Sequence, residues 1–166
     1  MNFEKPFGKY RARILTENDV SAVLALYKGN GEYFEHCPPK PDEDAVRDDM
    51  AALPPGKTKK DKLFLGFFEN GRLVAVTDLI LKYPDEKTAF LGLLMVEKAF
   101  QGKGTGSALV CSLLERLKED GFCRVRLGVV ETNLSARAFW LKNSFCPTGK
   151  EKKQKLYTVV EFEKEL

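Results

Sequence analysis

The feature that most constrains this chain is an apolar run that leads directly into a glycine-rich loop and a helical pattern. Residues 88–96, TAFLGLLMV, are almost wholly apolar, which predicts a central strand buried on both faces. The loop over 101–106, QGKGTG, follows, and leucines then recur at helical spacing within 107–120. A strand over 123–130 and a helix over 133–143 come next. This order of strand, loop, helix, strand and helix predicts an α/β fold.

The flanking segments predict further elements of the same domain. Asn70-Gly71 joins two β-runs within 62–83, a strong hairpin signal that makes the sheet mixed rather than purely parallel. We also expect a strand over 11–15, a helix from its cap Thr16 to Lys28, a helix near 42–53 and a final strand over 156–163. The rest of 29–61 is expected to be irregular, and the lysine runs 57–60 and 150–153 to be solvated loops. Because no repeat or linker is visible, residues 1–166 are predicted to form a single domain.

Composition argues against several classes of function. The formal charge of +3 is too small, and the basic residues too scattered, to predict a nucleic-acid partner or an anionic membrane. The start of the chain lacks the apolar core of a secretory signal, and no apolar run approaches the ~18 residues of a membrane span. The four cysteines share no metal-ligand spacing, and the chain has 1 histidine. We therefore expect a reduced, cytoplasmic protein without a metal site.

The glycine loop fits neither of two well-known phosphate motifs. Its glycines give G-x-G-x-G, whereas the dinucleotide fingerprint needs G-x-G-x-x-G, and Gly102-Lys103 is followed by a glycine where the P-loop needs Ser or Thr. The segment still favours an anion, because a helix N-terminus presents unpaired N–H groups and glycines let an oxygen approach the backbone. Lys103 adds a positive charge. A bare strand-to-helix turn is the alternative interpretation.

The segment from Gln101 to Gly106 resembles the cofactor motif of the GNAT superfamily of N-acetyltransferases. That motif reads Gln or Arg, two variable residues, Gly, one variable residue, and Gly or Ala. The second half of the family signature also follows at the expected distance, from Asn133 through small and aromatic helix residues to Lys142 and a phenylalanine. The resemblance covers about residues 88–149, and two linked motifs in this context are more specific than one glycine loop.

The resemblance implies a mixed, mostly antiparallel sheet flanked by helices, in which two central parallel strands splay apart to admit acetyl-CoA as cosubstrate. The pyrophosphate would lie on the amides of the glycine loop, and the pantetheine would pair with the strand edge at 94–96. Asn133 matches the position that commonly binds the pantetheine arm. The residues expected to contact the cofactor are Leu94, Met95, Val96, Gln101, Gly102, Lys103, Gly104, Thr105, Gly106, Asn133, Ala136, Phe139 and Lys142.

The reaction of this family is direct attack of an amine on the thioester, and it sets requirements for the site. A primary alkylamine of pKa ~10.4 is almost wholly protonated near pH 7, so a base or a water chain is needed. The oxyanion needs a donor, which we expect from a backbone N–H at a strand bulge near Met95. Many family members use a tyrosine of the second-motif helix to protonate the thiolate, but the matching residue here is Trp140. An indole N–H donates a hydrogen bond without acting as an acid, and Trp140 as a packing residue is the alternative.

The helix over 133–143 is apolar on two faces. Leu134, Ala138, Leu141 and Phe145 form one stripe, and Ala136, Phe139 and Trp140 lie roughly opposite. One face is expected to meet the sheet, and the other the cofactor or a partner chain.

Asp78 is the first candidate for the general base. Strand alternation places it on one face with Val74, Val76 and Ile80, and an acid on an apolar face tends to have a raised pKa. A structural, hydrogen-bonded aspartate is the alternative. Glu131, at the end of the next strand, is a second candidate, and Glu32, Glu35 and His36 rank after it.

The leading hypothesis is an acetyl-CoA-dependent N-acetyltransferase. A non-catalytic CoA-binding regulatory module with the same fold is the alternative, supported by Trp140 and by the absence of a carboxylate in the strand over 88–96. A nucleotide-binding enzyme is a third, weakened by the failed spacings. The acceptor is a small-molecule amine or the N-terminus or a lysine of a protein, and a homodimer is compatible with the family. Acidic stretches at 32–35 and 42–49 would favour a cationic acceptor if they are not simply solvated.

Overall fold

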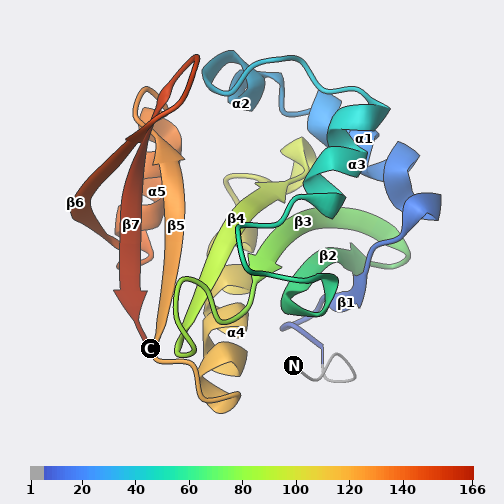
Figure 1. Cartoon of the computed structure of the whole chain (residues 1–166). Helices are drawn as coiled ribbons and strands as arrows, with labels where there is room; N and C mark the ends of the chain where they lie inside the picture. Colours follow the sequence, from blue (N-terminus) through green and yellow to red (C-terminus); the bar gives the residue numbers. More distant parts are fainter. Residues whose placement is uncertain (1–5) are drawn as a thin grey trace.

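The computed structural model describes residues 6–166, and a seven-stranded sheet in the order β1-β2-β3-β4-β5-β7-β6 runs through it (Figure 1). The strands are β1 (Arg11–Ile14), β2 (Lys62–Glu69), β3 (Arg72–Ile80), β4 (Thr88–Val96), β5 (Arg124–Val130), β6 (Cys146–Lys153) and β7 (Thr158–Glu165). Neighbouring strands are antiparallel except for β4 and β5, which pair in parallel. The expectation of a mixed, mostly antiparallel sheet with a parallel central pair is confirmed.

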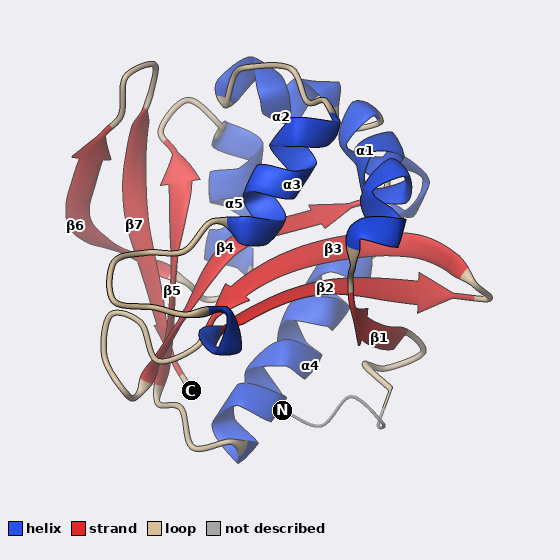
Figure 2. Cartoon of the chain, turned by 45° about the vertical axis from the view of Figure 1, so that its right-hand side comes forward, coloured by secondary structure: helices blue, strands red, loops and turns tan. Residues whose placement is uncertain are grey.

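Helices cover both faces of the sheet. They are α1 (Val20–Lys28), α2 (Gly31–His36), α3 (Glu43–Ala51), α4 (Thr105–Glu119) and α5 (Leu134–Lys142), with short 3₁₀ turns at η1 (Glu17–Asp19), η2 (Lys59–Asp61) and η3 (Lys98–Phe100). In Figure 2, α4 lies behind the sheet, and α1 and α3 lie in front of it. The α4 leucines pack into one buried cluster with α5 and the strands, and α1 and α3 pack into a second cluster with Val76 and Met95.

Local backbone chemistry accounts for the elements that the sequence predicts best. The hairpin turn between β2 and β3 lies at Asn70 and Gly71, whose φ values are 50° and 82°. Thr16 opens the first helical segment with a capping box to Asp19, although the segment begins as the turn η1 before α1. Helix α4 is followed by Gly121 at φ 85°, as expected for a glycine after a helix end.

One strand and one α-helix were not predicted. Residues 150–153, expected to be a solvated loop, belong to the strand β6, which is mostly exposed at the edge of the sheet and pairs with β7. An edge strand of this kind needs no apolar face, so its sequence carries no strand pattern. Within the segment expected to be irregular, α2 forms a short helix of 6 residues.

The prediction that residues 88–96 are buried on both faces is wrong for part of β4, most of all after Leu91. Ala89, Leu91 and Met95 are buried, but Gly92 is exposed and Phe90, Leu93 and Leu94 are half-buried. The reason is that β5 leaves β4 after Leu91, so the rest of the strand borders open space.

Candidate active site

The parallel strands β4 and β5 separate in the middle of the sheet. They pair from Thr88 opposite Arg124 to Leu91 opposite Leu127, and the pairing ends there. Figure 1 shows the two strands diverging from that common end. The edge of β4 over 92–96 therefore has no strand beside it. Such an edge can bind an extended ligand through its N–H and C=O groups, as an added strand would.

A first cavity of about 430 Å³ lies along this edge, between β4, the glycine loop and α5. All residues expected to contact acetyl-CoA line it except Lys103; they are Leu94, Met95, Val96, Gln101, Gly102, Gly104, Thr105, Gly106, Asn133, Ala136, Phe139 and Lys142. Asn30, Tyr33 and Ser135 also line it without having been expected at the site, and so does Glu32, which was expected only as an acid–base candidate. Asn30, Glu32 and Tyr33 come from the segment around α2, and its loop-rich composition was the only sequence signal for them.

The glycine loop has a backbone that side chains would disturb. Gly102 and Gly104 have φ values of 71° and 80°, and a Cβ built on either would meet no atom within 4 Å. Gly104 is also the N-cap of α4, a helix of 15 residues. The loop thus combines open space over its backbone with the N–H groups and positive dipole end of a long helix, which suits a phosphate group.

Two side chains of the glycine loop form hydrogen bonds within the protein. Gln101 Nε2 donates to Asn30 Oδ1 at 2.6 Å and to the carbonyl of Val96 at 2.8 Å, so this side chain ties the loop to the end of β4. Lys103 Nζ donates to the carbonyl of Ala99 at 2.9 Å, outside the first cavity. In this position the lysine folds back onto the turn η3, and its contact with the cofactor stays a prediction.

Asn133 caps α5 rather than presenting its oxygen to the cavity. Its Oδ1 accepts hydrogen bonds from the N–H of Ala136 and the hydroxyl of Ser135, both at 2.9 Å. Asn133 is buried beside the first cavity, so its capping role fixes the start of α5 at this wall.

Trp140 lies in an aromatic cluster at the base of α5. Its ring makes edge-on contacts with Phe139 and Phe145, with ring centroids 4.9 Å and 5.0 Å away. It is 7% exposed, whereas Leu134 and Leu141 on the opposite stripe are 69% and 48% exposed. The face with Ala136, Phe139 and Trp140 is therefore the one that packs inward, and these contacts favour the packing role of Trp140.

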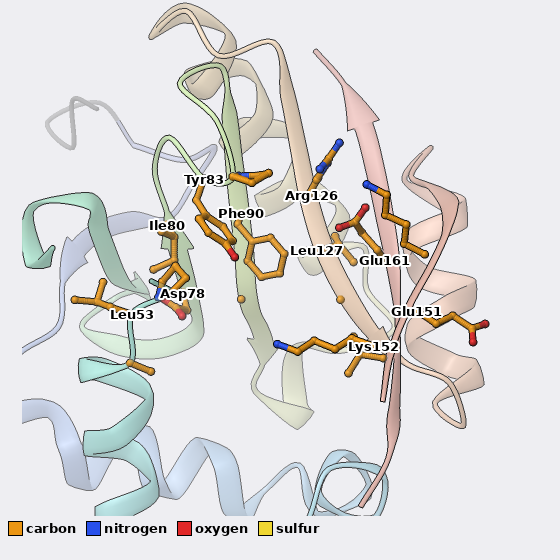
Figure 3. A pocket seen from close by; sticks show the side chains of 17 residues that line it. Leu53, Asp78, Ile80, Tyr83, Phe90, Arg126, Leu127, Glu151, Lys152 and Glu161 are labelled. Atoms are coloured by element: carbon orange, nitrogen blue, oxygen red, sulfur yellow. The ribbon is translucent and has the colours of Figure 1, made fainter. Parts of the chain in front are cut away.

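A second cavity of about 650 Å³ borders β4 and β5 near their separation (Figure 3). Asp78 lies on its wall and forms an ion pair with Lys62, with Oδ1 and Nζ 2.7 Å apart. The two side chains are 15% and 5% exposed. Burial raises the pKa of the Asp78 carboxyl above its usual value, and the Lys62 charge opposes that rise.

Asp78 is held next to a bulge in β4. Asp78 is opposite Leu93 and the next residue of β3 is opposite Leu91, so Gly92 is the extra residue. A Cβ built on Gly92 would lie 2.7 Å from Asp78 Oδ2, which means that the carboxylate fills the space beside this glycine. The bulge was expected near Met95 and lies three residues earlier, because the register shift occurs where β4 begins to leave β5.

One of the residues predicted to share the face of Asp78 lies on the other side of the sheet. Val76 packs on the α1 side and Ile80 lines the second cavity with Asp78, as alternation predicted. Val74 packs into the cluster on the α4 side instead. The register shift between Phe67 and Phe68 in the pairing of β2 with β3 breaks the alternation at that point.

The other acid–base candidates lie apart from Asp78. Glu131 is exposed in the turn after β5 and lines neither cavity. Glu35 does not line either cavity. His36 does not line them either, and its Nδ1 lies 2.9 Å from the hydroxyl of Thr132. Glu32 and Tyr33 reach the first cavity, and burial raises the pKa of the Tyr33 hydroxyl, which therefore stays protonated.

Within residues 6–166, no three His, Cys, Asp or Glu side chains are grouped so that they could hold a metal ion. None of the helices in that range has both the length and the apolar character that crossing a membrane requires.

Comparison with known families identifies the relatives of this chain. The family described as "Acetyltransferase (GNAT) family" matches residues 21–145. A mycothiol acetyltransferase of Beutenbergia cavernae is 31% identical over 135 residues, which cover 81% of this chain and 43% of that protein. The chain thus spans less than half the length of this curated relative.

Solved structures share the fold. An acetyltransferase from Thermus thermophilus superimposes with a TM-score of 0.73 at 23% identity, covering 95% of this chain and 97% of that one. The PaiA N-acetyltransferase of Thermoplasma acidophilum, solved in complex with coenzyme A, superimposes with a TM-score of 0.64 at 18% identity, covering 92% and 97%.

Proposed function

Since the chain belongs to the acetyltransferase (GNAT) family, a family of acyltransferases, we propose that it transfers the acetyl group of acetyl-CoA to a primary amine by direct attack on the thioester. One observation carries the proposal. Two cavities border β4 where it leaves β5, one built on the glycine loop and the other holding a buried carboxylate. This arrangement suits a cosubstrate on one side and an acceptor on the other.

The first cavity has the groups that acetyl-CoA requires. The N–H groups at the start of α4 and the open backbone of Gly102 and Gly104 suit the pyrophosphate. The edge of β4 over 94–96 suits the amides of the pantetheine arm, and Phe139 and Lys142 on α5 form the facing wall. When bound, acetyl-CoA supplies the activated acetyl group, and the chain itself supplies the positioning.

Asp78 is the group that we assign to proton removal from the acceptor. In the reaction a C–N bond forms, the C–S bond breaks, and the nitrogen loses a proton. Asp78 lies beside the bulge at Gly92, and the burial that raises its pKa makes it a stronger base than an exposed carboxylate. Lys62 holds the carboxylate in place. Because a base acts in its ionised form, kcat/KM should rise with pH through the raised pKa of this group.

The thiolate must receive its proton from elsewhere. Trp140 has no acidic proton near neutral pH, and its ring is held in the aromatic cluster with Phe139 and Phe145. We therefore assign this proton to water rather than to α5.

The non-catalytic CoA-binding module is the second candidate. Two contacts favour it, namely the ion pair that engages Asp78 and the packing that engages Trp140. Binding of acetyl-CoA without turnover of any amine would support it.

Two measurements test the proposal. Acetyl-CoA at 100 times its Kd should stabilise the fold by about 2.7 kcal/mol, and the melting temperature should rise, while NAD and ATP leave it unchanged. Thiol release from acetyl-CoA in the presence of a panel of primary amines then separates the enzyme from the non-catalytic module. A shift with ATP alone would overturn the assignment of the cosubstrate.

A further inference from the structure

The second cavity has an apolar wall that is suited to the body of a small acceptor. Leu53, Ile80, Tyr83 and Phe90 line this side. The rings of Tyr83 and Phe90 meet edge-on, with centroids 5.9 Å apart, so they form a fixed aromatic surface. A cavity of about 650 Å³ has room for a molecule the size of an amino acid, and its apolar wall favours an apolar side chain.

The opposite wall carries two cations without carboxylate partners. Lys150 and Lys152 are two residues apart on β6 and line the second cavity. Neither forms an ion pair within residues 6–166, whereas Arg126 in the same cavity pairs with Glu163. Figure 3 shows Lys152 extending across the gap toward β4, below Phe90 in this view, while Glu151 points away.

Three acids line this cavity; two of them have partners, and the third, Glu151, points away from the cavity in Figure 3. Asp78 pairs with Lys62, and the carboxylate of Glu161 accepts a hydrogen bond from Thr148 at 3.0 Å. In the formal charge of the lining, Asp78, Glu151 and Glu161 balance Arg126, Lys150 and Lys152. Within residues 6–166, however, no carboxylate pairs with Lys150 or Lys152, so an anionic group of a ligand can pair with them.

From these contacts, and resting on the function proposed above, we propose that the acceptor is a small amine that carries a carboxylate and an apolar side chain, as free apolar amino acids do. The amine lies at Asp78 and the bulge of β4, and the side chain lies against Tyr83 and Phe90. The carboxylate faces Lys150 and Lys152.

The test compares L-phenylalanine with L-phenylalaninamide, which keeps the amine and the ring but lacks the carboxylate. Initial rates are measured by thiol release from acetyl-CoA, with Phe-Gly-Gly and spermidine as further acceptors. We expect kcat/KM to be about tenfold higher for L-phenylalanine, because a hydrogen bond to a charged group is worth more than a neutral one. The amide has the larger fraction of neutral amine at pH 7, since it lacks a negative charge beside the nitrogen, so this bias works against the expected preference.

The variants Lys152→Gln and Lys153→Gln provide the matched pair. Both lysines lie on β6 and are exposed, but Lys153 does not line the second cavity. The preference for L-phenylalanine over its amide should fall about tenfold in Lys152→Gln and persist in Lys153→Gln. Equal or better turnover of the amide, of the tripeptide or of spermidine by the wild-type enzyme would overturn the acceptor class while leaving the acetyltransferase function intact. Turnover of another primary amine but of none of these four would also overturn the acceptor class alone, whereas acetyl-CoA binding without turnover of any amine in the wider panel would overturn both.

Discussion

Gly92→Ala is the substitution that most directly tests how the fold positions Asp78. A Cβ at this position would lie 2.7 Å from Asp78 Oδ2, and ordinary van der Waals contact begins at 3.4 Å, so the two groups must separate by about 0.7 Å. Asp78 cannot yield easily, because its carboxylate is bound to Lys62, which is 5% exposed and also donates to the carbonyl of Ala52.

The size of the effect follows from this geometry. Forcing a methyl group into a packed site costs about 1–3 kcal/mol of stability. A displacement of a positioned group by about 1 Å can cost roughly 10²-fold in rate. We expect Gly92→Ala to lower kcat by one to two orders of magnitude, and its affinity for acetyl-CoA to stay close to the wild type, because Gly92 does not line the first cavity.

Gly128→Ala is the matched control for this prediction. Gly128 is also a strand glycine of the second cavity, and its Cβ would lie 2.5 Å from Val159 Cγ1, so the crowding is similar but displaces an apolar side chain. Thermal unfolding, initial rates and calorimetric titration of both variants are needed. We expect similar losses of stability and a much larger loss of kcat in Gly92→Ala. Wild-type kcat in a folded Gly92→Ala enzyme would refute the placement of Asp78 in the reaction.

Three further predictions concern the glycine loop, Trp140 and the pH dependence of stability. Gly104→Val should lower acetyl-CoA affinity at least tenfold in calorimetric titration. The control Gly56→Val has the same φ of 80° but lies away from the first cavity, so it should lose only ~1–2 kcal/mol of stability to backbone strain. Equal affinity in the two variants would mean that the glycine loop is only a turn. Trp140→Phe should lower the free energy of unfolding by ~1–3 kcal/mol and keep kcat within about threefold, because the indole packs in a buried cluster. A hundredfold loss of kcat in the folded variant would assign Trp140 a role in the reaction. The Arg13 guanidinium lowers the pKa of Asp19 to about 2, so Asp19 stabilises the fold above pH ~3.8, and this contribution is lost as the pH falls toward 2. In urea unfolding, Asp19→Asn should therefore lower the free energy of unfolding by about 1–2 kcal/mol at pH 7 and by little at pH 2. A loss of stability that does not depend on pH would contradict this.

The parts of the fold that the sequence predicts are those determined by local chemistry. The hairpin at Asn70-Gly71 and the capped start of α5 depend on residues a few positions apart, so their patterns are readable. The strand β6 depends on pairing with β7 across the chain, and its own residues, such as Lys150 and Lys152, are polar and exposed. Its polar sequence therefore predicts a loop.

In the candidate site too, the features set by local sequence were predicted and those set by long-range contacts were not. The glycine loop follows from glycine spacing and its place between a strand and a helix, and the residues expected to contact the cofactor, Lys103 excepted, line one cavity. The pairing of Asp78 with Lys62 and the entry of Tyr33 into the first cavity depend on segments brought together by the fold. No periodicity in the sequence marks such contacts, which is why Lys62 and Tyr33 were missed and the bulge was placed three residues late.

The most direct test of the central claim measures both products of the reaction in one sample. The protein is incubated with acetyl-CoA and a panel of primary amines, and free CoA and acetylated amine are quantified together by mass spectrometry. We predict that one amine at least yields N-acetylated product in a 1:1 ratio to CoA, at a rate proportional to protein concentration. Saturable binding of acetyl-CoA with no acetylated amine, or release of CoA without it, would contradict the proposed acetyl transfer.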